Sequence, residues 1–309
     1  MKLATYRDGS RDGQLVVVSR DLALAHYASG IATRLQQVLD DWNFLSPQLE
    51  DLAATLHGGK ARHAFAFDPA RCMAPLPRAY QWALGPGAAA GPPAGTGTGS
   101  CLGWPTQRAS DDFLGPQDAV RLPGTTTPRG LQAGFAVVTG DLPLGLTPAQ
   151  ALERVRLVLL AHVWTLPGGV QPAGAFAPLA VTPDELGEAW REGRVLLDVR
   201  TRREAGATGP AGEVSPAHFG QPSPDFAALL AALSRVRSVR AGSIVGPCAE
   251  PAGPHPTTAP AIDPASGPGA QAWHDGDLAH SEATGPDGLS VFGALAQRVA
   301  LAGEPATRA

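Results

Sequence analysis

The feature that most constrains this chain is an interior stretch without a regular pattern. Residues 84–108 read LGPGAAAGPPAGTGTGSCLGWPTQR, and eleven of these 25 residues are glycine or proline. Glycine loses much conformational entropy in a helix or strand and proline lacks the backbone donor, so we expect no regular element to run through the stretch. Residues 198–225 and 247–272 are likewise filled with Gly, Pro, Ala and Arg. We call these three ranges the low-information blocks. We expect the segments between them to form the fold.

The remaining segments are patterned and predict short strands and amphipathic helices. Strands are predicted where β-branched and other apolar residues cluster between turn residues, at 3–6, 15–18, 135–140 and 239–246. Helices are predicted where apolar residues recur with helical spacing, at 31–42, 46–56, 147–159 and 182–186. Ser46-Pro47 and Thr147-Pro148 are typical helix starts.

Length, charge and cysteine content exclude several classes of protein. The 309 residues suit one large domain or a small and a larger one, and 44% hydrophobic content supports a buried core. A net charge of −4 argues against nucleic acid as a partner. No apolar run reaches the ~18 residues of a membrane span, so we expect no membrane partner, and a cytoplasmic protein. Cys72, Cys101 and Cys248 show no zinc or disulfide spacing.

Several patterned segments resemble the fumarylacetoacetate hydrolase family, in family order. The opening, MKLATYRDGSRDGQLVVVSRDLALAHYASGIATRLQQVLDDW, resembles the N-terminal domain of the bacterial two-domain members, and residues 73–82 resemble the entry to the catalytic domain. SDDFLGP, AVVTGDLPLGLTPAQALERVRLVLL, PAGAFAPLAVTPDELGEAW and VRAGSIVG follow, and Gly276-Asp277 with SVFG at 290–293 resembles the closing strands. Together these segments cover a little over half the chain.

The resemblance implies an α+β fold in two domains. Residues 1–72 would form a small N-terminal α/β domain, and residues 73–303 a mixed β-sandwich roll that is the catalytic domain of the family. Members are usually homodimers. Because the low-information blocks replace strands of the roll, we expect the roll to be incomplete there and well formed at 1–80 and 135–196.

The resemblance also implies an activity. Family members hydrolyse a carbon–carbon bond in a dicarbonyl, acylpyruvate-like acid, as in the catabolism of aromatic compounds. A divalent metal, Mg²⁺ or Ca²⁺, chelates the substrate, and a His–Glu pair activates water. A small-molecule dicarbonyl acid is therefore the expected partner.

The family's metal ligands are missing from the aligned positions. Two glutamates, two residues apart on a strand, fall on Gln132 and Gly134, and a downstream aspartate falls on Val163. The upstream aspartate and the His–Glu pair should lie within 83–109, a range without Asp, Glu or His. Since hard cations need carboxylate oxygens, we expect this chain to bind no metal at the family site.

No catalytic residue can be named on this basis. The active-site lysine of the family falls on Gln171, and Pro247-Cys248 replaces the Gly-Thr substrate loop. Tyr80 and Gln171 are the candidates for substrate contact, although simple packing between the domains is the default interpretation of Tyr80. His162 has two interpretations, a pocket residue or, more commonly, a hydrogen-bonded structural histidine. For His274-Asp275-Gly276-Asp277 with His280, a terminal strand and turn is preferred over a metal cluster.

Two explanations for the missing ligands stay open. The chain is either a catalytically inactive scaffold of the family or a copy damaged by compensated frameshifts. In a GC-rich gene, out-of-frame codons yield sequence rich in Gly, Pro, Ala and Arg. The sharp edges of the low-information blocks favour the second explanation. Translation of the three blocks in the other two frames tests it, because frameshifts predict strand-like sequence there.

Overall fold

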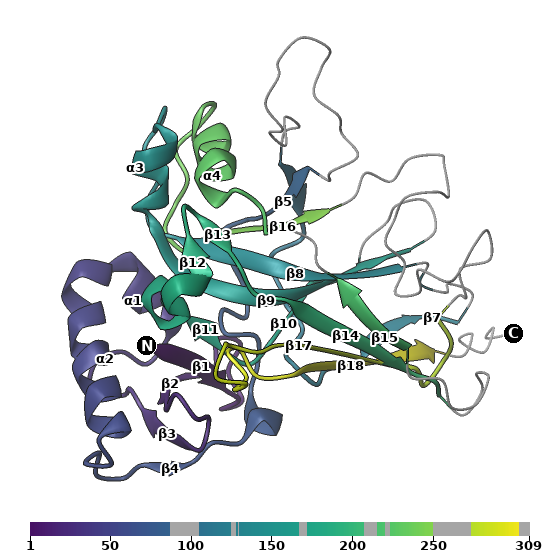
Figure 1. Ribbon diagram of the computed structural model, residues 1–309, viewed down its shortest axis with the longest axis horizontal. Helices are drawn as coiled ribbons and strands as arrows, with labels where there is room; N and C mark the ends of the chain where they lie inside the picture. The colour runs from purple at the N-terminus through teal and green to yellow at the C-terminus, as the bar shows by residue number, and fades with distance from the viewer. Residues whose placement is uncertain are drawn as a thin grey trace, which may run out of the picture.

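Two sheets carry the fold. The computed structural model describes residues 1–86, 105–124, 128, 130–166, 172–206, 215–219, 223–249 and 273–302. The larger sheet has 11 strands in the order β4-β3-β2-β1-β11-β9-β8-β16-β5-β6, with β10 paired to β9. The second has five strands in the order β15-β14-β17-β18-β7. The long β8 and β9 cross the middle of the molecule, with β14, β17 and β18 beside them (Figure 1).

The N-terminal strands form one end of the larger sheet, and two helices cover them (Figure 1). The elements of this part are β1 (Lys2–Tyr6), β2 (Gln14–Val18), β3 (Leu24–Tyr27), α1 (Leu35–Asp40), α2 (Trp42–His57), β4 (Phe65–Ala66) and the 3₁₀ turn η1 (Pro69–Arg71). Leu3, Leu15 and Val17 pack with the buried helix residues Val38 and Leu49. The predicted strands are confirmed, but the second helix begins at Trp42 and contains Pro47 in its interior.

The centre of the larger sheet is the β8–β9 pair. The other elements here are β5 (Trp82–Pro86), β6 (Thr106–Arg108), β8 (Gly130–Thr139), α3 (Pro148–Leu152), β9 (Val155–Thr165), β10 (Ala175–Phe176), β11 (Ala180–Val181) and β16 (Ile244–Ala249). The predicted helix over 147–159 is wrong beyond Leu152. From Val155 onward the chain is a strand, because its Val and Leu side chains are buried on both faces between β8 and β11.

The second sheet and its neighbours complete the roll. They comprise β7 (Val120–Pro123), η3 (Pro183–Ala189), β12 (Trp190–Arg191), β13 (Arg194–Val195), β14 (Val199–Glu204), β15 (Ser215–Phe219), α4 (Phe226–Ser234), β17 (Leu278–Ala283) and β18 (Leu295–Ala302). The predicted helix at 182–186 is confirmed as the start of a 3₁₀ segment. The mixed sheets with few helices confirm the predicted α+β roll.

Parts of the low-information blocks form strands, so the expectation that they lack regular structure is wrong there. In β14 the side chains alternate between buried Val199 and Thr201 and exposed Arg200 and Arg202, a period of two that marks a half-buried strand. β5 and β6 pair across the first block, and β16 enters the third. Residues 87–104 and 250–272 lie outside the described part of the chain.

The border predicted between residues 72 and 73 does not interrupt the larger sheet. β1 pairs with β11 through Lys2–Val181 and Leu3–Ala180, so the N-terminal strands continue the sheet of the roll. The domain boundary itself stays a prediction. Of the described helices, none has both the length and the apolar character needed to cross a bilayer.

Candidate functional site

The β8–β9 ladder brings the three positions aligned with the family's metal ligands together. Gln132 lies directly opposite Val163, and Gly134 follows two residues along β8. Side chains two residues apart on a strand share a face, and directly paired residues are neighbours on that face. The predicted clustering of Gln132, Gly134 and Val163 therefore agrees with the register.

Around Val163 this face of the sheet is apolar and packed, whereas Gln132 and Gly134 are half-buried. Val163 is 2% exposed and belongs to one buried cluster with Trp82, Phe113 and Phe176. The three aromatic rings pack edge to face, with ring centroids 5.7 Å apart for Trp82–Phe113 and 5.0 Å for Phe113–Phe176. Such packing is typical of a protein core.

The residues at the aligned positions do not fit a divalent metal. They offer one amide, no side chain and one isopropyl group, whereas Mg²⁺ and Ca²⁺ take several oxygen ligands including carboxylates. Within the described ranges, no three His, Cys, Asp or Glu side chains are grouped so that they could hold an ion.

The two candidates for substrate contact remain predictions. Tyr80 is 64% exposed and precedes β5, so it is not part of the packed aromatic cluster. Gln171 lies outside the described residues.

His162 is on the opposite face of β9, in a buried polar network between the two sheets. Its Nδ1 lies 3.1 Å from Gln297 Oε1, which also accepts from Trp164 Nε1 at 2.8 Å. Because a carbonyl oxygen only accepts, Nδ1 carries the proton and Nε2 accepts from the Ser281 hydroxyl at 2.6 Å. Ser281 in turn lies 2.7 Å from the Thr201 hydroxyl.

This network makes His162 a satisfied structural histidine. Its side chain is completely buried, and burial lowers its pKa to about 3, against a smaller opposite effect of the Gln297 hydrogen bond. The imidazole is therefore neutral at pH 7 and connects β9 with β17 and β18. The more common of the two interpretations predicted for this histidine fits the structure.

The His274–Asp277 segment is a turn ahead of β17, as preferred from the sequence. Asp277 is buried and accepts from Arg203 Nε at 3.1 Å, the His274 amide at 2.8 Å and the Gly206 amide at 2.8 Å. With its oxygens used in this way, Asp277 connects the turn to β14 and does not act as a metal ligand.

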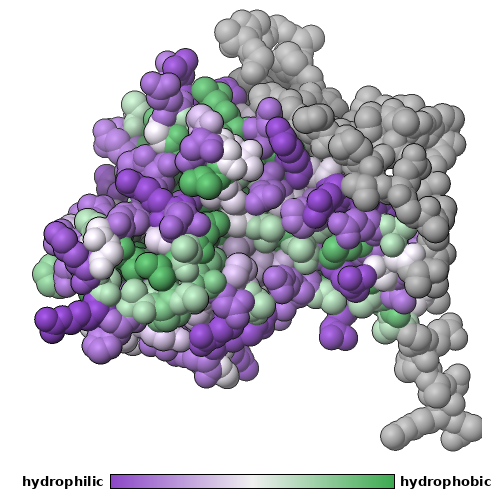
Figure 2. Space-filling model, turned by 60° about the horizontal axis from the view of Figure 1, so that its bottom comes forward, coloured by the Kyte–Doolittle hydropathy of each residue, from purple (hydrophilic) through white to green (hydrophobic). Residues whose placement is uncertain are grey.

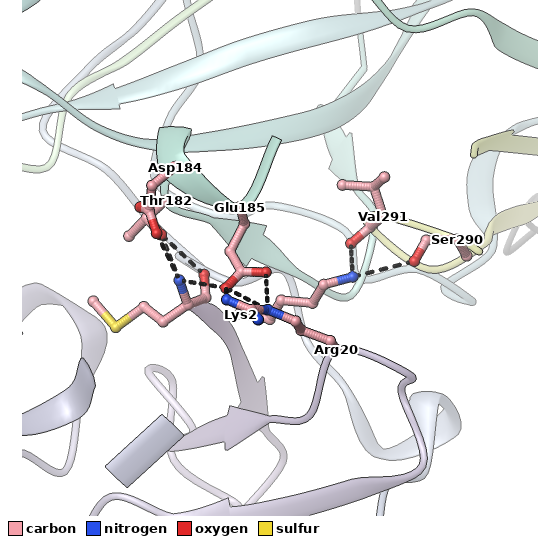
Figure 3. Close-up of polar contacts among 8 residues, drawn as sticks. Lys2, Arg20, Thr182, Asp184, Glu185, Ser290 and Val291 are labelled. Atoms are coloured by element: carbon pink, nitrogen blue, oxygen red, sulfur yellow. Dashed lines mark hydrogen bonds and ion pairs between the residues drawn. The ribbon is translucent and has the colours of Figure 1, made fainter. Parts of the chain in front are cut away.

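A hollow of about 430 Å³ lies where β1 meets η3 and the loop before β18. Figure 3 shows Lys2 reaching toward this loop, where its Nζ donates to the carbonyl oxygens of Ser290 at 3.2 Å and Val291 at 3.0 Å. The Glu185 carboxylate accepts a two-pronged contact from Arg20 and lies 3.1 Å from the N-terminal ammonium.

Burial and ion pairing shift the pKa values of the charged groups at this hollow. Burial lowers the pKa of Lys2, and nearby carboxylates including Glu185 partly offset the effect. Burial alone would raise the pKa of Glu185, but hydrogen bonds and charge from Arg20 and the N-terminus lower it overall. These residues were not predicted as a site from the sequence. The available signal was a lysine, Lys2, at the start of an apolar strand.

The surface turned forward in Figure 2 is mixed. Hydrophilic residues cover most of it, and hydrophobic ones gather in one area at the left of the view. Large apolar side chains that are exposed come from separate parts of the chain: Leu24, Phe44, Tyr80, Leu144, Leu196, Val236 and Leu289.

The fold defines a class: mixed β-rolls whose larger sheet is extended by N-terminal strands under two helices. In sequence, residues 1–78 match the family described as fumarylacetoacetase N-terminal domain 2. This match confirms the predicted resemblance to the fumarylacetoacetate hydrolase family for these residues. No curated protein matches the chain in sequence.

Solved structures share the fold over nearly the whole chain. Maleylpyruvate hydrolase from Sphingobium sp. SYK-6, in complex with manganese(II) and pyruvate, is 16% identical with a TM-score of 0.65, covering 97% of this chain and 99% of its own. Fumarylacetoacetate hydrolase from Exiguobacterium antarcticum is 18% identical with a TM-score of 0.63, at 98% and 100% coverage. A 2-hydroxyhepta-2,4-diene-1,7-dioate isomerase from Mycobacterium marinum is 16% identical with a TM-score of 0.56, at 97% and 98% coverage.

Proposed function

We propose that the chain is a hydrolase of the fumarylacetoacetate hydrolase type, which cleaves a carbon–carbon bond in an acylpyruvate-like dicarbonyl acid. The observation that carries this proposal is the fold shared with maleylpyruvate hydrolase over 97% of this chain and 99% of that one. The family match of residues 1–78 supports it independently.

The chain's own residues limit how such a reaction would proceed. The maleylpyruvate hydrolase structure contains manganese, which agrees with a divalent metal in related proteins. Gln132, Gly134 and Val163 do not supply the carboxylates for such an ion. We therefore assign no catalytic step to a metal in this chain and name no catalytic residue.

One specific observation favours a second candidate function, an inactive scaffold of the same family. On the face that carries the aligned positions, Val163 is buried in one cluster with the packed rings of Trp82, Phe113 and Phe176. A frameshift-damaged copy would have the same properties as such a scaffold.

Two assays on the same protein distinguish the hydrolase from the inactive scaffold. The full chain is incubated with acetylpyruvate and Mn²⁺, Mg²⁺ or Ca²⁺, product pyruvate is quantified, and Mn²⁺ binding is measured by calorimetry. The hydrolase proposal expects pyruvate release above the protein-free rate. Release no faster than this control with every ion would contradict it and support the inactive scaffold.

Three further properties are proposed from the resemblance: a homodimer, a cytoplasmic location and substrate contact by Tyr80 and Gln171. Sedimentation equilibrium tests the first, and cell fractionation tests the second. If hydrolysis is found, Tyr80→Phe and Gln171→Ala are expected to raise the KM for acetylpyruvate. An unchanged KM in both variants would refute the predicted contacts.

A further inference from the structure

We infer that Pro247 occupies the space of the side chain missing at Gly134, so that the face of β8 and β9 that carries Gln132, Gly134 and Val163 no longer has room for the family's carboxylates. The face is thus not an emptied site to which carboxylates could simply be restored. This inference concerns packing, and it holds whether or not the chain hydrolyses dicarbonyl acids.

The contact between β8 and β16 shows the replacement directly. A Cβ added to Gly134 would lie 2.9 Å from Pro247 Cβ and 3.6 Å from Pro247 Cγ. Carbon atoms pack at about 3.5–4.0 Å, so even an alanine at 134 needs Pro247 to move. Pro247 is buried and its ring is rigid, which leaves no flexible side-chain end to give way.

Pro247 is held in place by Gly246. This glycine has a φ of +97°, and a Cβ on it would lie 2.9 Å from the Phe135 carbonyl oxygen. Its own carbonyl oxygen accepts from Trp82 Nε1 at 2.9 Å. The backbone before Pro247 is therefore fixed both by close approach to β8 and by a buried hydrogen bond.

The aromatic side of the face is equally full. A Cβ on Gly174 would overlap the six-membered ring of Trp82. Phe176 packs against the same ring with centroids 5.9 Å apart. Glycines at 134 and 174 thus admit Pro247 and Trp82 respectively, and the two bulky groups line the region where the aligned carboxylates would project.

Charge adds to the steric argument. A glutamate at 134 and an aspartate at 163 would put two carboxylates among Pro247, Trp82 and Phe176. Buried charges without partners are strongly unfavourable, and like charges at close range increase the cost. A cation could offset this energetic cost only if several oxygens coordinated it at once. Pro247 and Trp82 occupy the space that those oxygens would need.

A mutant cycle tests the inference on the full chain. Gly134→Ala, Pro247→Gly and the double variant are compared with the wild-type protein by thermal unfolding. We expect Gly134→Ala to lower the melting temperature by several degrees in the wild-type background, and to lower it less when residue 247 is glycine. An equal loss in both backgrounds would overturn the inference.

Gly130→Ala is the matched control. Gly130 is on β8, an even number of residues from Gly134 and thus on the same face, but a Cβ there would meet nothing within 4 Å. We expect its melting temperature to stay close to the wild-type value. A loss as large as that of Gly134→Ala would show that the strand, rather than Pro247, rejects the added atom.

Mn²⁺ binding provides the second readout, independent of hydrolysis. The variant Gln132→Glu/Gly134→Glu/Val163→Asp is expected to be less stable than wild type and to show no saturable Mn²⁺ binding by electron paramagnetic resonance. If this variant fails to fold, Gln132→Glu/Val163→Asp, which keeps Gly134, serves in its place with the same expectation. Stoichiometric Mn²⁺ binding by a folded variant with Pro247 present would overturn the inference.

Discussion

At the scale of single residues, the buried His162 gives the protein a defined response to acid. Its imidazole connects Ser281 and Gln297 without contact with solvent, and after burial the nearby His280 lowers its pKa further. A proton added to Nε2 would replace the acceptor of the Ser281 hydroxyl with a second donor. The Ser281 hydroxyl could turn to accept from Nε2 and donate to Thr201, but a charged imidazole at this completely buried position is unfavourable in the folded protein.

We predict that stability falls as the pH is lowered from about 6.5 toward 3. Burial lowers the pKa of folded His162 to about 3, whereas unfolded histidine titrates near 6.5. In this window the unfolded state binds more protons, so the free energy of unfolding decreases by up to about 1.4 kcal/mol for each pH unit lost. The stabilising contribution is complete above pH ~6.5.

Urea unfolding between pH 4.5 and 7.5 checks this prediction. His162→Gln should have a shallower pH slope than wild type, because the difference between the two proteins isolates the histidine from the carboxylates. His63→Asn is the control, since His63 is exposed and its φ of +65° suits asparagine. Equal slopes for wild type and His162→Gln would contradict the assignment.

The sequence indicated which positions of the candidate site share a face, but not which residues pack against them. Strand alternation together with the family alignment was enough to bring Gln132, Gly134 and Val163 onto one face. It could not show that Pro247 fills the space at Gly134, because that contact joins two distant strands. For the same reason, the ring of Trp82 beside Gly174 became visible only in the folded chain.

At the scale of elements, local patterns were overridden where tertiary packing decides. Val155–Thr165 has helix-compatible spacing, but a run of buried residues fits a central strand equally well, and pairing with β8 decides for the strand. The arginine-rich composition of β14 did not indicate a strand. Its first four residues nevertheless have a period of two, because each exposed arginine follows a buried Val or Thr. The predicted helix start at Ser46-Pro47 is wrong, because Pro47 lies in the interior of α2.

Pro47 predicts a simple stabilising change in α2. Proline lacks an amide hydrogen and its ring crowds the preceding turn, so Pro47→Ala should add a backbone hydrogen bond in a 16-residue helix. We expect the free energy of unfolding to rise by about 1–3 kcal/mol. Urea denaturation measures it, with exposed Glu50→Ala in the same helix as the control. A lower or unchanged free energy for Pro47→Ala would refute the prediction.

At the scale of the whole molecule, the strand ladder between the N-terminal strands and the roll is short but well anchored. β1 meets β11 through only Lys2–Val181 and Leu3–Ala180. The Glu185 carboxylate is 4% exposed and joins Arg20 with the N-terminal ammonium across this junction. Polar anchoring therefore supplements a short ladder.

Weakening this anchor should loosen the N-terminal strands selectively. Glu185→Gln removes the charge that faces Arg20 and the N-terminus, at a cost of about 1–3 kcal/mol. We expect faster amide hydrogen exchange in β1 and β2 than in wild type, and little change in β8 and β9. Glu188→Gln, an exposed neighbour, is the control. Uniform acceleration over both groups of strands would show that the junction does not open separately.

The pairing of β18 with β7 has a consequence for synthesis. β7 (Val120–Pro123) lies parallel to residues 299–302, so its partner leaves the ribosome long after β7 itself. Until then the nascent chain carries a strand edge with free backbone groups, which invites association with other chains. Translation speed and chaperone supply, rather than final stability, would then govern the yield of correctly assembled protein.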